Sequence, residues 1–237
     1  MKKYLSVYTL FLRQSLPRLA LTLPILFVIE AALFLFGLLG NEGFMHFDQL
    51  ISDSYHEWLF LAALIIIAVG ICSEGGRSYC SQLLTIERLR IGKNAVFLTR
   101  GAAYATCYLV AFASEIISVS LFLAIWCALA PEGLPGAQEI LITLYRDPYL
   151  HSLIPLEDLI LYMRNMILIV SLGFCTAADV GGRAPFKAVL LLLIFGFLGI
   201  YSELGDIFKP ISLSLIALIV AAISIIGELR REKKYDD

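Results

Sequence analysis

The sequence predicts an all-α polytopic membrane protein with six transmembrane helices. Apolar residues make up 59% of its 237 residues, more than a soluble domain of this length needs for its core. They gather in runs that approach or exceed the roughly 20 residues of helix needed to cross a bilayer. The basic residues concentrate in alternate connections between these runs. The whole chain, residues 1–237, is therefore expected to form a single transmembrane domain.

The predicted spans follow the apolar runs in order along the chain. They cover about residues 19–39, 58–73, 102–129, 159–178, 188–201 and 211–227. Pro24 lies near the start of the first span and is expected to kink it. The helix of the second span is expected to continue towards Tyr79. The third span is longer than a bilayer requires, so it should tilt or protrude.

The segment before the first span has two interpretations. Basic and polar residues share one face of a helix there, and apolar residues share the other. This pattern predicts a helix in the cytosolic interface, where Lys2, Lys3 and Arg13 contact lipid phosphates and which Pro17 ends. The alternative is that the same residues extend the first span. No small-residue cleavage site closes the first apolar run, so a cleavable signal peptide is not expected.

Two long connections, residues 40–57 and 130–157, are rich in acidic residues. The first has no Lys or Arg, and the second has Arg146 as its only basic residue. Within the second, residues 139–145 are apolar but too few to cross a bilayer. They predict a short interfacial helix on the outer side of the membrane, or a shallow re-entrant segment.

The positions of the basic residues predict the orientation of the spans. Fifteen of the eighteen Lys and Arg lie in the N-terminal segment, the connection after the second span, the turn after the fourth and the C-terminal tail. Loops rich in Lys and Arg stay in the cytosol. Both termini are therefore expected in the cytosol, in a multi-pass protein of the cell membrane.

Residues 82–101, QLLTIERLRIGKNAVFLTRG, form a polar and mainly basic segment between two long apolar runs. Leucine and isoleucine recur in its first part with helical spacing, so we expect a short helix on the cytosolic membrane surface. Gly92 is placed to end this helix through the left-handed conformation, and Asn94 is placed to cap the next one. Such a basic elbow can dock against another protein, or it can be an ordinary loop that only fixes topology.

Three ionisable residues lie within predicted spans: Glu30, Glu115 and Arg164. A charged side chain in hydrocarbon costs about 2.5–3.5 kcal/mol or more, so each should face protein or water. One interpretation is a polar path for substrate or protons. The other is a structural ion pair, or a carboxyl kept protonated by its surroundings. Arg164 can also extend outward to the membrane surface.

The sequence shows no pattern of an enzyme, a metal site or a nucleic-acid interface. The zincin, nucleophile-elbow and phosphate-loop motifs do not occur, so no catalytic residue, cofactor or metal is expected. The five cysteines show no paired spacing and are expected to be reduced thiols. His46, His56 and His151 lie in the predicted outer loops and are interpreted as solvated residues. The basic segments lack interleaved aromatic residues, which favours contact with phospholipid over nucleic acid.

The order of these parts resembles the membrane subunits of ABC-2-type (type V exporter) ABC transporters, in the small bacterial form whose ATPase is a separate chain. The segment LLTIERLRIGKNAVFLTRG is similar to the coupling helix that runs into the third span of that family. The long outer segment differs, since it lies here between the third and fourth spans and in the family between the fifth and sixth.

The resemblance implies a permease subunit that moves substrate while a cytosolic ATPase binds and hydrolyses ATP. It also implies pairing with a second copy or a sister subunit, and contact with the ATPase through Glu87, Arg88, Leu89 and Arg90. Two alternatives remain open from the residues alone. One is a stand-alone secondary transporter with Glu30 and Glu115 as a proton relay, and the other is a non-transporting scaffold or immunity-type protein.

Overall fold

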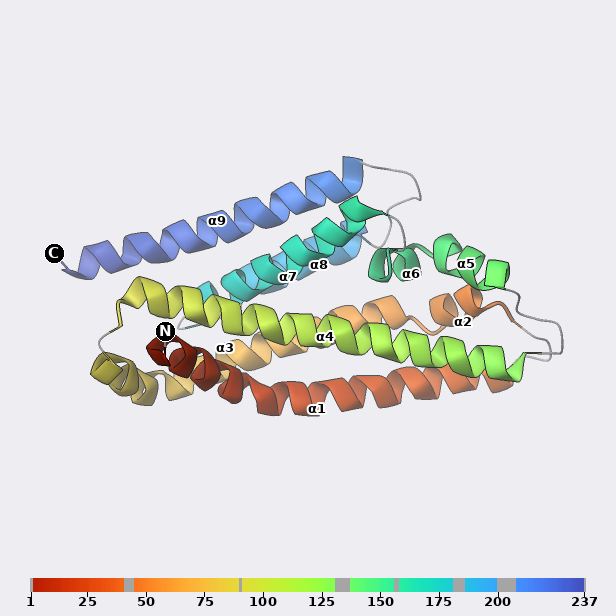
Figure 1. Ribbon diagram of the computed structural model, residues 1–237, viewed down its shortest axis with the longest axis horizontal. Coiled ribbons are helices and arrows are strands. Elements are labelled where there is room, and N and C mark those ends of the chain that lie inside the picture. The colour runs from red at the N-terminus through yellow and green to blue at the C-terminus, as the bar shows by residue number, and fades with distance from the viewer. Residues whose placement is uncertain are drawn as a thin grey trace.

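The computed structural model describes residues 2–40, 45–89, 91–130, 137–155, 158–180, 186–199 and 208–236. Side chains are described over the same ranges except at 2, 74–89, 137, 197–199 and 229–236. Every regular element in these ranges is an α-helix (Figure 1). The all-α fold predicted from the apolar runs is confirmed.

Five long helices form the bundle, and each contains one of the predicted spans. They are α1 (Lys2–Gly40), α3 (His56–Leu89), α4 (Lys93–Leu129), α7 (Leu159–Asp179) and α9 (Phe208–Asp236). All five are long and apolar enough to cross a membrane, which indicates a multi-pass membrane protein. The predicted fifth span corresponds to α8 (Phe186–Gly199), which has 14 residues and a length of about 21 Å. That is shorter than the roughly 30 Å hydrocarbon core, so a sixth crossing stays a prediction.

The two ends of the bundle carry different elements of the chain (Figure 1). One end, here named the cap end, carries the short helices α2 (Phe47–Asp53), α5 (Ala137–Arg146) and α6 (Pro148–Leu153). The other, named the elbow end, carries both chain termini and the connection from α3 to α4. The short helix expected at residues 139–145 is α5, whereas α2 and α6 were not expected.

The N-terminal segment belongs to the same helix as the first span. The expectation that Pro17 ends a separate interfacial helix is wrong, because α1 continues through both Pro17 and Pro24. A proline inside a helix removes one backbone hydrogen bond. Phe11 before Pro17 and Leu19 after it are both buried in the core, so packing on each side of the proline stabilises the continuous helix. Of the predicted lipid-contact residues with described side chains, Lys3 and Arg13 are exposed.

The elbow also differs from the expectation. It forms no separate short helix, since α3 continues to Leu89 and has 34 residues. Gly92 does not adopt the left-handed conformation; with φ −61° and ψ 141° it is the N-cap of α4, and Asn94 lies inside that helix. The Gly92 carbonyl accepts from the backbone N–H of Ala95 at 3.0 Å and of Val96 at 3.1 Å. Glycine is tolerated at an N-cap, so α4 begins before Asn94 can act as a cap.

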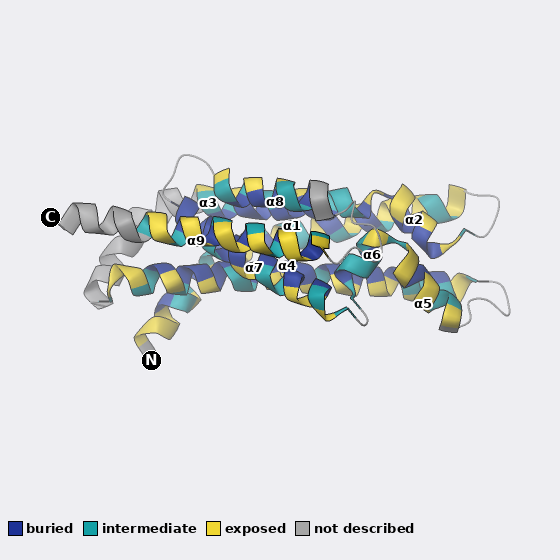
Figure 2. Ribbon diagram, turned by 90° about the horizontal axis from the view of Figure 1, so that it is seen from above, coloured by how far each residue is buried: buried dark blue, intermediate teal, exposed yellow. Residues whose placement is uncertain are grey.

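Helix α4 occupies the middle of the bundle, packed between α1 and α7, and α7 packs in turn against α9. Asp179 at the end of α7 accepts from the backbone N–H of Lys187 at 2.9 Å and of Ala188 at 3.0 Å. It therefore supplies the cap that the first turn of α8 requires. The faces of the long helices turned away from the bundle carry exposed large apolar residues (Figure 2). This pattern suits a lipid environment.

Candidate functional site

Glu30 of α1 and Glu115 of α4 face one another in the interior of the bundle. Each is almost fully buried, with 0% and 1% of its surface exposed. Glu30 lies ten residues before the cap end of α1, about 15 Å along the helix axis. Glu115 lies fourteen residues before the end of α4, about 21 Å along its axis. The two carboxyl groups are near enough to interact directly, so both intramembrane glutamates predicted from the sequence meet at one site.

Helical spacing places an aromatic stack beside this carboxyl pair. Phe27 and Phe34 share a face of α1 with Glu30, since they lie three residues before it and four after it. Phe122 lies seven residues after Glu115 on α4. Its ring stacks on Phe27 with centroids 5.8 Å apart and on Phe34 at 5.0 Å. In this part of the bundle, the α1–α4 contact therefore consists of packed rings beside two buried acids.

A tyrosine from the short helix α6 completes the site. The Tyr149 hydroxyl donates a hydrogen bond to Oε1 of Glu115. Asp147 caps the start of α6 by accepting from the backbone N–H of Leu150 at 2.9 Å, and Pro148 is the first helical residue. Burial, and next the charge of Glu115, raises the pKa of Tyr149 well above its usual range. The hydroxyl therefore keeps its proton and acts as a donor.

Three carboxyl oxygens of the pair have no hydrogen-bond partner among the described residues. They are both oxygens of Glu30 and Oε2 of Glu115. A buried polar atom without a partner loses its hydration without compensation, at about 1–3 kcal/mol and more if it is charged. Such orphaned atoms are uncommon in folded proteins and point to a bound ligand, a water molecule or a proton that satisfies them.

Arg164 of α7 is buried, with 1% of its surface exposed, and does not extend to the membrane surface. Its guanidinium donates to Oδ1 of Asn165 at 3.0 Å and to the Ser152 hydroxyl of α6. Asn165 donates to the Ser152 carbonyl at 2.7 Å, and the guanidinium lies 5.1 Å from the ring centroid of Phe195 in α8. Among the described side chains Arg164 forms no ion pair with either glutamate. It anchors α6 to α7 and α8.

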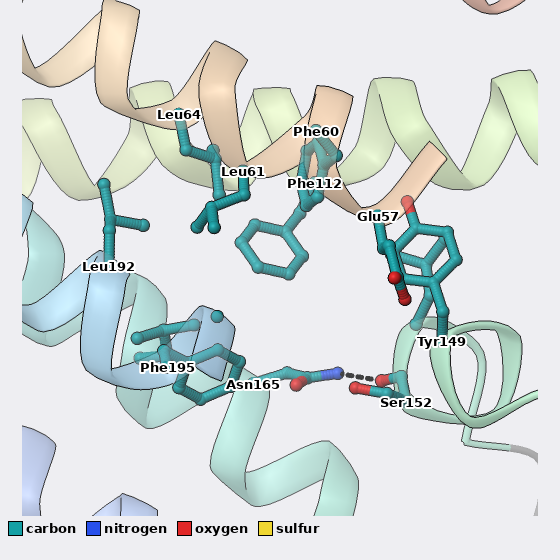
Figure 3. Close-up of a pocket in the computed structure, with 13 residues that line it drawn as sticks. Glu57, Phe60, Leu61, Leu64, Phe112, Tyr149, Ser152, Asn165, Leu192 and Phe195 are labelled. Carbon is teal, nitrogen blue, oxygen red and sulfur yellow. Dashed lines mark hydrogen bonds between the residues drawn. The ribbon is translucent and has the colours of Figure 1, made fainter. Parts of the chain in front are cut away.

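A cavity lies between α3, α4, α6, α7 and α8, directly beside Tyr149 (Figure 3). Its polar lining comes from Glu57, Tyr149, Ser152 and Asn165, and leucine and phenylalanine side chains make up most of the rest. Its volume is about 60 Å³. Pockets for drug-sized ligands measure about 300–1,000 Å³, so in this conformation the cavity has room for a few water molecules only.

The three histidines were all expected to be solvated, but their environments differ. That interpretation is wrong for His56, which is fully buried at the start of α3 and packs edge-on against Phe122 at 5.6 Å. Neither ring nitrogen makes a hydrogen bond of good geometry, although the backbone of Ile51 lies near. His46 is exposed and pairs with Glu139 at 3.6 Å. No group of three or more His, Cys, Asp or Glu able to hold a metal occurs among the described residues.

Three of the four predicted coupling residues lie at the end of α3. Glu87, Arg88 and Leu89 belong to its last turn, but their side chains, and all of Arg90, lie outside the described residues. Sequence reasoning missed Tyr149 and Ser152 of α6. One available signal was Asp147-Pro148, because Asp at an N-cap followed by Pro is a typical helix start.

Comparison of the chain with protein-family models, curated proteins and solved structures finds no match in any of the three. A functional assignment therefore depends on the residues and the helix arrangement of this chain itself.

Proposed function

We propose that this protein is the membrane-spanning permease subunit of an ATP-driven ABC exporter whose ATPase is a separate cytosolic chain. One observation carries the proposal: α3 extends well beyond its apolar part and ends in the basic elbow. The predicted span ends at about Ser73 and the residues after it are largely polar, but the helix runs on to Leu89, which adds about 24 Å. A surplus of this length suits an element that contacts a partner outside the bilayer.

The distribution of charge supports a cytosolic position for the elbow end. Arg88, Arg90 and Lys93 lie in the elbow, and the basic termini lie at the same end of the bundle (Figure 1). Lys and Arg at one membrane face are typical of the cytosolic side. Exposed Lys3 and Arg13, together with Lys2, then contact anionic lipid headgroups there.

The helix arrangement supports a mechanism for coupling. Closure of the ATPase around ATP displaces Glu87, Arg88, Leu89 and Arg90 at the elbow. The elbow joins two helices of 34 and 37 residues, which act as levers, and α4 packs on both α1 and α7. A tilt of α4 therefore changes the packing of the bundle as a rigid-body motion. A second copy of the chain, or a sister subunit, provides the other half of the transport path.

The first test is purification of the tagged full chain from its native membranes, with co-purifying chains identified by mass. A soluble ATPase in stoichiometric amount is expected. Recovery of the chain alone, together with transport driven by a proton gradient in vesicles, would contradict the proposal and favour a secondary transporter.

The second test reverses the charge of the elbow with Arg88→Glu and Arg90→Glu. We expect loss of ATPase co-purification and of transport, with normal membrane insertion, because the contact surface then carries the wrong sign. Arg230→Glu with Arg231→Glu makes the same change of charge in α9 and serves as the matched control. Unchanged transport by the elbow variant would exclude this segment as the coupling element.

A further inference from the structure

We propose that Glu30 and Glu115 form a proton-binding site that holds one proton between the two carboxyl groups, and that the docking of α6 through Tyr149 depends on this proton. The site is assigned from its geometry alone. It holds whether the chain works with an ATPase or by itself.

The first step of the argument concerns charge. Glu30 and Glu115 are buried together, and two ionised carboxylates in contact repel strongly where water is excluded. Two carboxyl groups sharing one site therefore do not both ionise. Among the described side chains no Lys or Arg pairs with either acid. One proton between the two groups removes the repulsion and provides a hydrogen bond to orphaned oxygens of the pair.

The second step distinguishes a proton from a metal cation. The two carboxyl groups and the Tyr149 hydroxyl are the oxygen-bearing side chains that interact at the site. Calcium takes six to eight oxygen ligands, and magnesium prefers six. Phe27, Phe34 and Phe122 pack beside the acids, and their rings offer no oxygen ligand to a metal cation. A proton needs only two acceptors, which the pair provides.

The third step concerns Tyr149. Its hydroxyl donates to Glu115, and a hydrogen bond to a charged acceptor is stronger than one to a neutral acceptor. The bond is therefore strongest when Glu115 is the ionised member and Glu30 holds the proton. Loss of that proton leaves two carboxylates in contact, and their repulsion separates α1 from α4 and moves Glu115 away from Tyr149. Helix α6 then keeps the polar contact of Ser152 with Arg164 and Asn165. Proton occupancy and the seating of α6 are therefore linked.

The fourth step is access for the proton. Tyr149 lines the cavity of about 60 Å³ together with Glu57 (Figure 3), and its hydroxyl contacts Glu115, so it connects the cavity to the carboxyl pair. The cavity has room for water, and Glu57 offers an acceptor on the way. Towards the cap end, the same group of helices also carries His56 of α3, Asp147 of α6, Asp48 of α2 and Arg164 of α7.

The experiment uses the full chain in phosphatidylcholine vesicles and dicyclohexylcarbodiimide, an apolar reagent that modifies protonated carboxyl groups. We expect modification of Glu30 or Glu115 at pH 6, located by peptide mass, which falls about tenfold per pH unit once the pair ionises. Glu30→Gln is expected to abolish labelling of Glu115, because the new amide and the Tyr149 hydroxyl then both donate to Glu115 and stabilise its ionised form. Asp53→Asn, at an exposed position on α2, is the matched control and leaves the labelling unchanged.

Three outcomes would overturn the proposal. One is labelling of Glu115 that persists in Glu30→Gln, because the two acids then titrate independently. Another is suppression of labelling by sodium or calcium at constant pH, which would assign the site to a metal cation. The proposal also predicts a protonated-carboxyl band in the infrared spectrum at pH 7 that is lost in Glu30→Gln. A wild-type spectrum without this band is the third outcome. This spectrum does not depend on access of the reagent.

The link to α6 has its own readout, amide hydrogen exchange of residues 148–153 corrected for the intrinsic effect of pH. In the wild-type chain, exchange of α6 is expected to rise about tenfold between pH 6 and pH 9 as the pair loses its proton. Glu30→Gln should remove this rise. An α6 whose corrected exchange is equal at both pH values would show that its seating is independent of the proton.

Discussion

Helix α4 meets α7 on one side and α1 on the other, and the two contacts are built from different residues. Towards α7 the backbones approach so closely that a Cβ on Gly173 would lie 2.5 Å from the backbone nitrogen of Ala105. The Tyr108 hydroxyl and the Thr176 hydroxyl share a hydrogen bond of 2.8 Å across the same contact. The contact with α1 has a similar bond, between the hydroxyls of Tyr8 and Thr106 at 2.8 Å, but nearer the cap end phenylalanine rings stack around the buried carboxyl pair.

The α4–α7 contact is therefore a fixed structural one, whereas the α1–α4 contact can adjust. A backbone-to-backbone contact depends on the absence of a side chain, and no change of pH alters it. The α1–α4 contact contains groups whose charge changes with protonation, and a short helix from the cap end reaches into it. We therefore expect α4 and α7 to move as one body, and the α1–α4 contact to respond to conditions.

The largest effect is expected at the α4–α7 contact. Gly173→Ala places a methyl group against the backbone of Ala105, so the helices must separate, at a cost of about 3 kcal/mol. Gly227→Ala in α9, where nothing lies within 4 Å of the new Cβ, should instead gain up to about 1 kcal/mol in helix propensity. Unfolding of both variants in mild detergent measures the difference. Equal stability of the two would show that the close approach is not required.

The next effect is expected at the α1–α4 contact. Glu30→Gln keeps the shape of the side chain and removes one potential charge, so it should protect the folded protein at alkaline pH. The expected gain over the wild type is about 2 kcal/mol at pH 9, where two carboxylates would otherwise repel, with little change at pH 6. Thermal unfolding at the two pH values tests this expectation. A uniform destabilisation at both would mean that Glu30 serves packing alone.

A smaller effect is expected where α6 is anchored to α7. Arg164→Lys keeps the positive charge but loses the planar donor group that reaches Ser152 and Asn165 together. Lysine cannot reproduce that geometry, so we expect a loss of about 1.5 kcal/mol and faster hydrogen exchange in α6. Arg146→Lys is the control. Its pairing with Asp48 at 3.4 Å involves an exposed arginine and contributes little.

The smallest effect concerns His151, whose ring lies 4.6 Å from that of Tyr145 at the cap end. Burial lowers the pKa of His151 below its ordinary value of 6.5, so the folded chain binds this proton less readily than the unfolded chain. As the pH falls through about 6.5, the unfolded chain takes up a proton first, and stability declines on the acid side. His151→Phe should keep the ring contact and remove this part of the decline. Melting temperatures at pH 5 and pH 7.5 would show it.

The apolar runs sufficed to predict the five long helices, because the length of an apolar segment is a local property of the chain. The same reasoning failed at Pro17, where a local helix breaker lies beside residues that packing holds in helix. Phe11 and Leu19 are buried on both sides of Pro17, and their partners are far away in sequence. No local sequence pattern could therefore predict that packing outweighs the proline and keeps the helix continuous.

The candidate site divides in a similar way. Glu30 and Glu115 were identified because a charge inside a predicted span is costly. Their meeting depends on the rotation and axial position of α1 against α4, which the stacked rings of Phe27, Phe34 and Phe122 set. Tyr149 carried no signal of its own, because a tyrosine in a polar outer segment is ordinary.

By itself, then, the sequence determined that this chain is helical and membrane-embedded, and which ionisable residues lie within its apolar runs. It did so because hydropathy and helix length depend only on neighbouring residues. Only the tertiary structure decided that Glu30 and Glu115 form one site, that Tyr149 of α6 completes it, and that Arg164 anchors α6 without joining the pair. Those facts depend on side-chain packing between different helices, across 34 residues for Glu115 and Tyr149 and 12 for Arg164 and Ser152. The low dielectric of the interior there makes each charge depend on its neighbours.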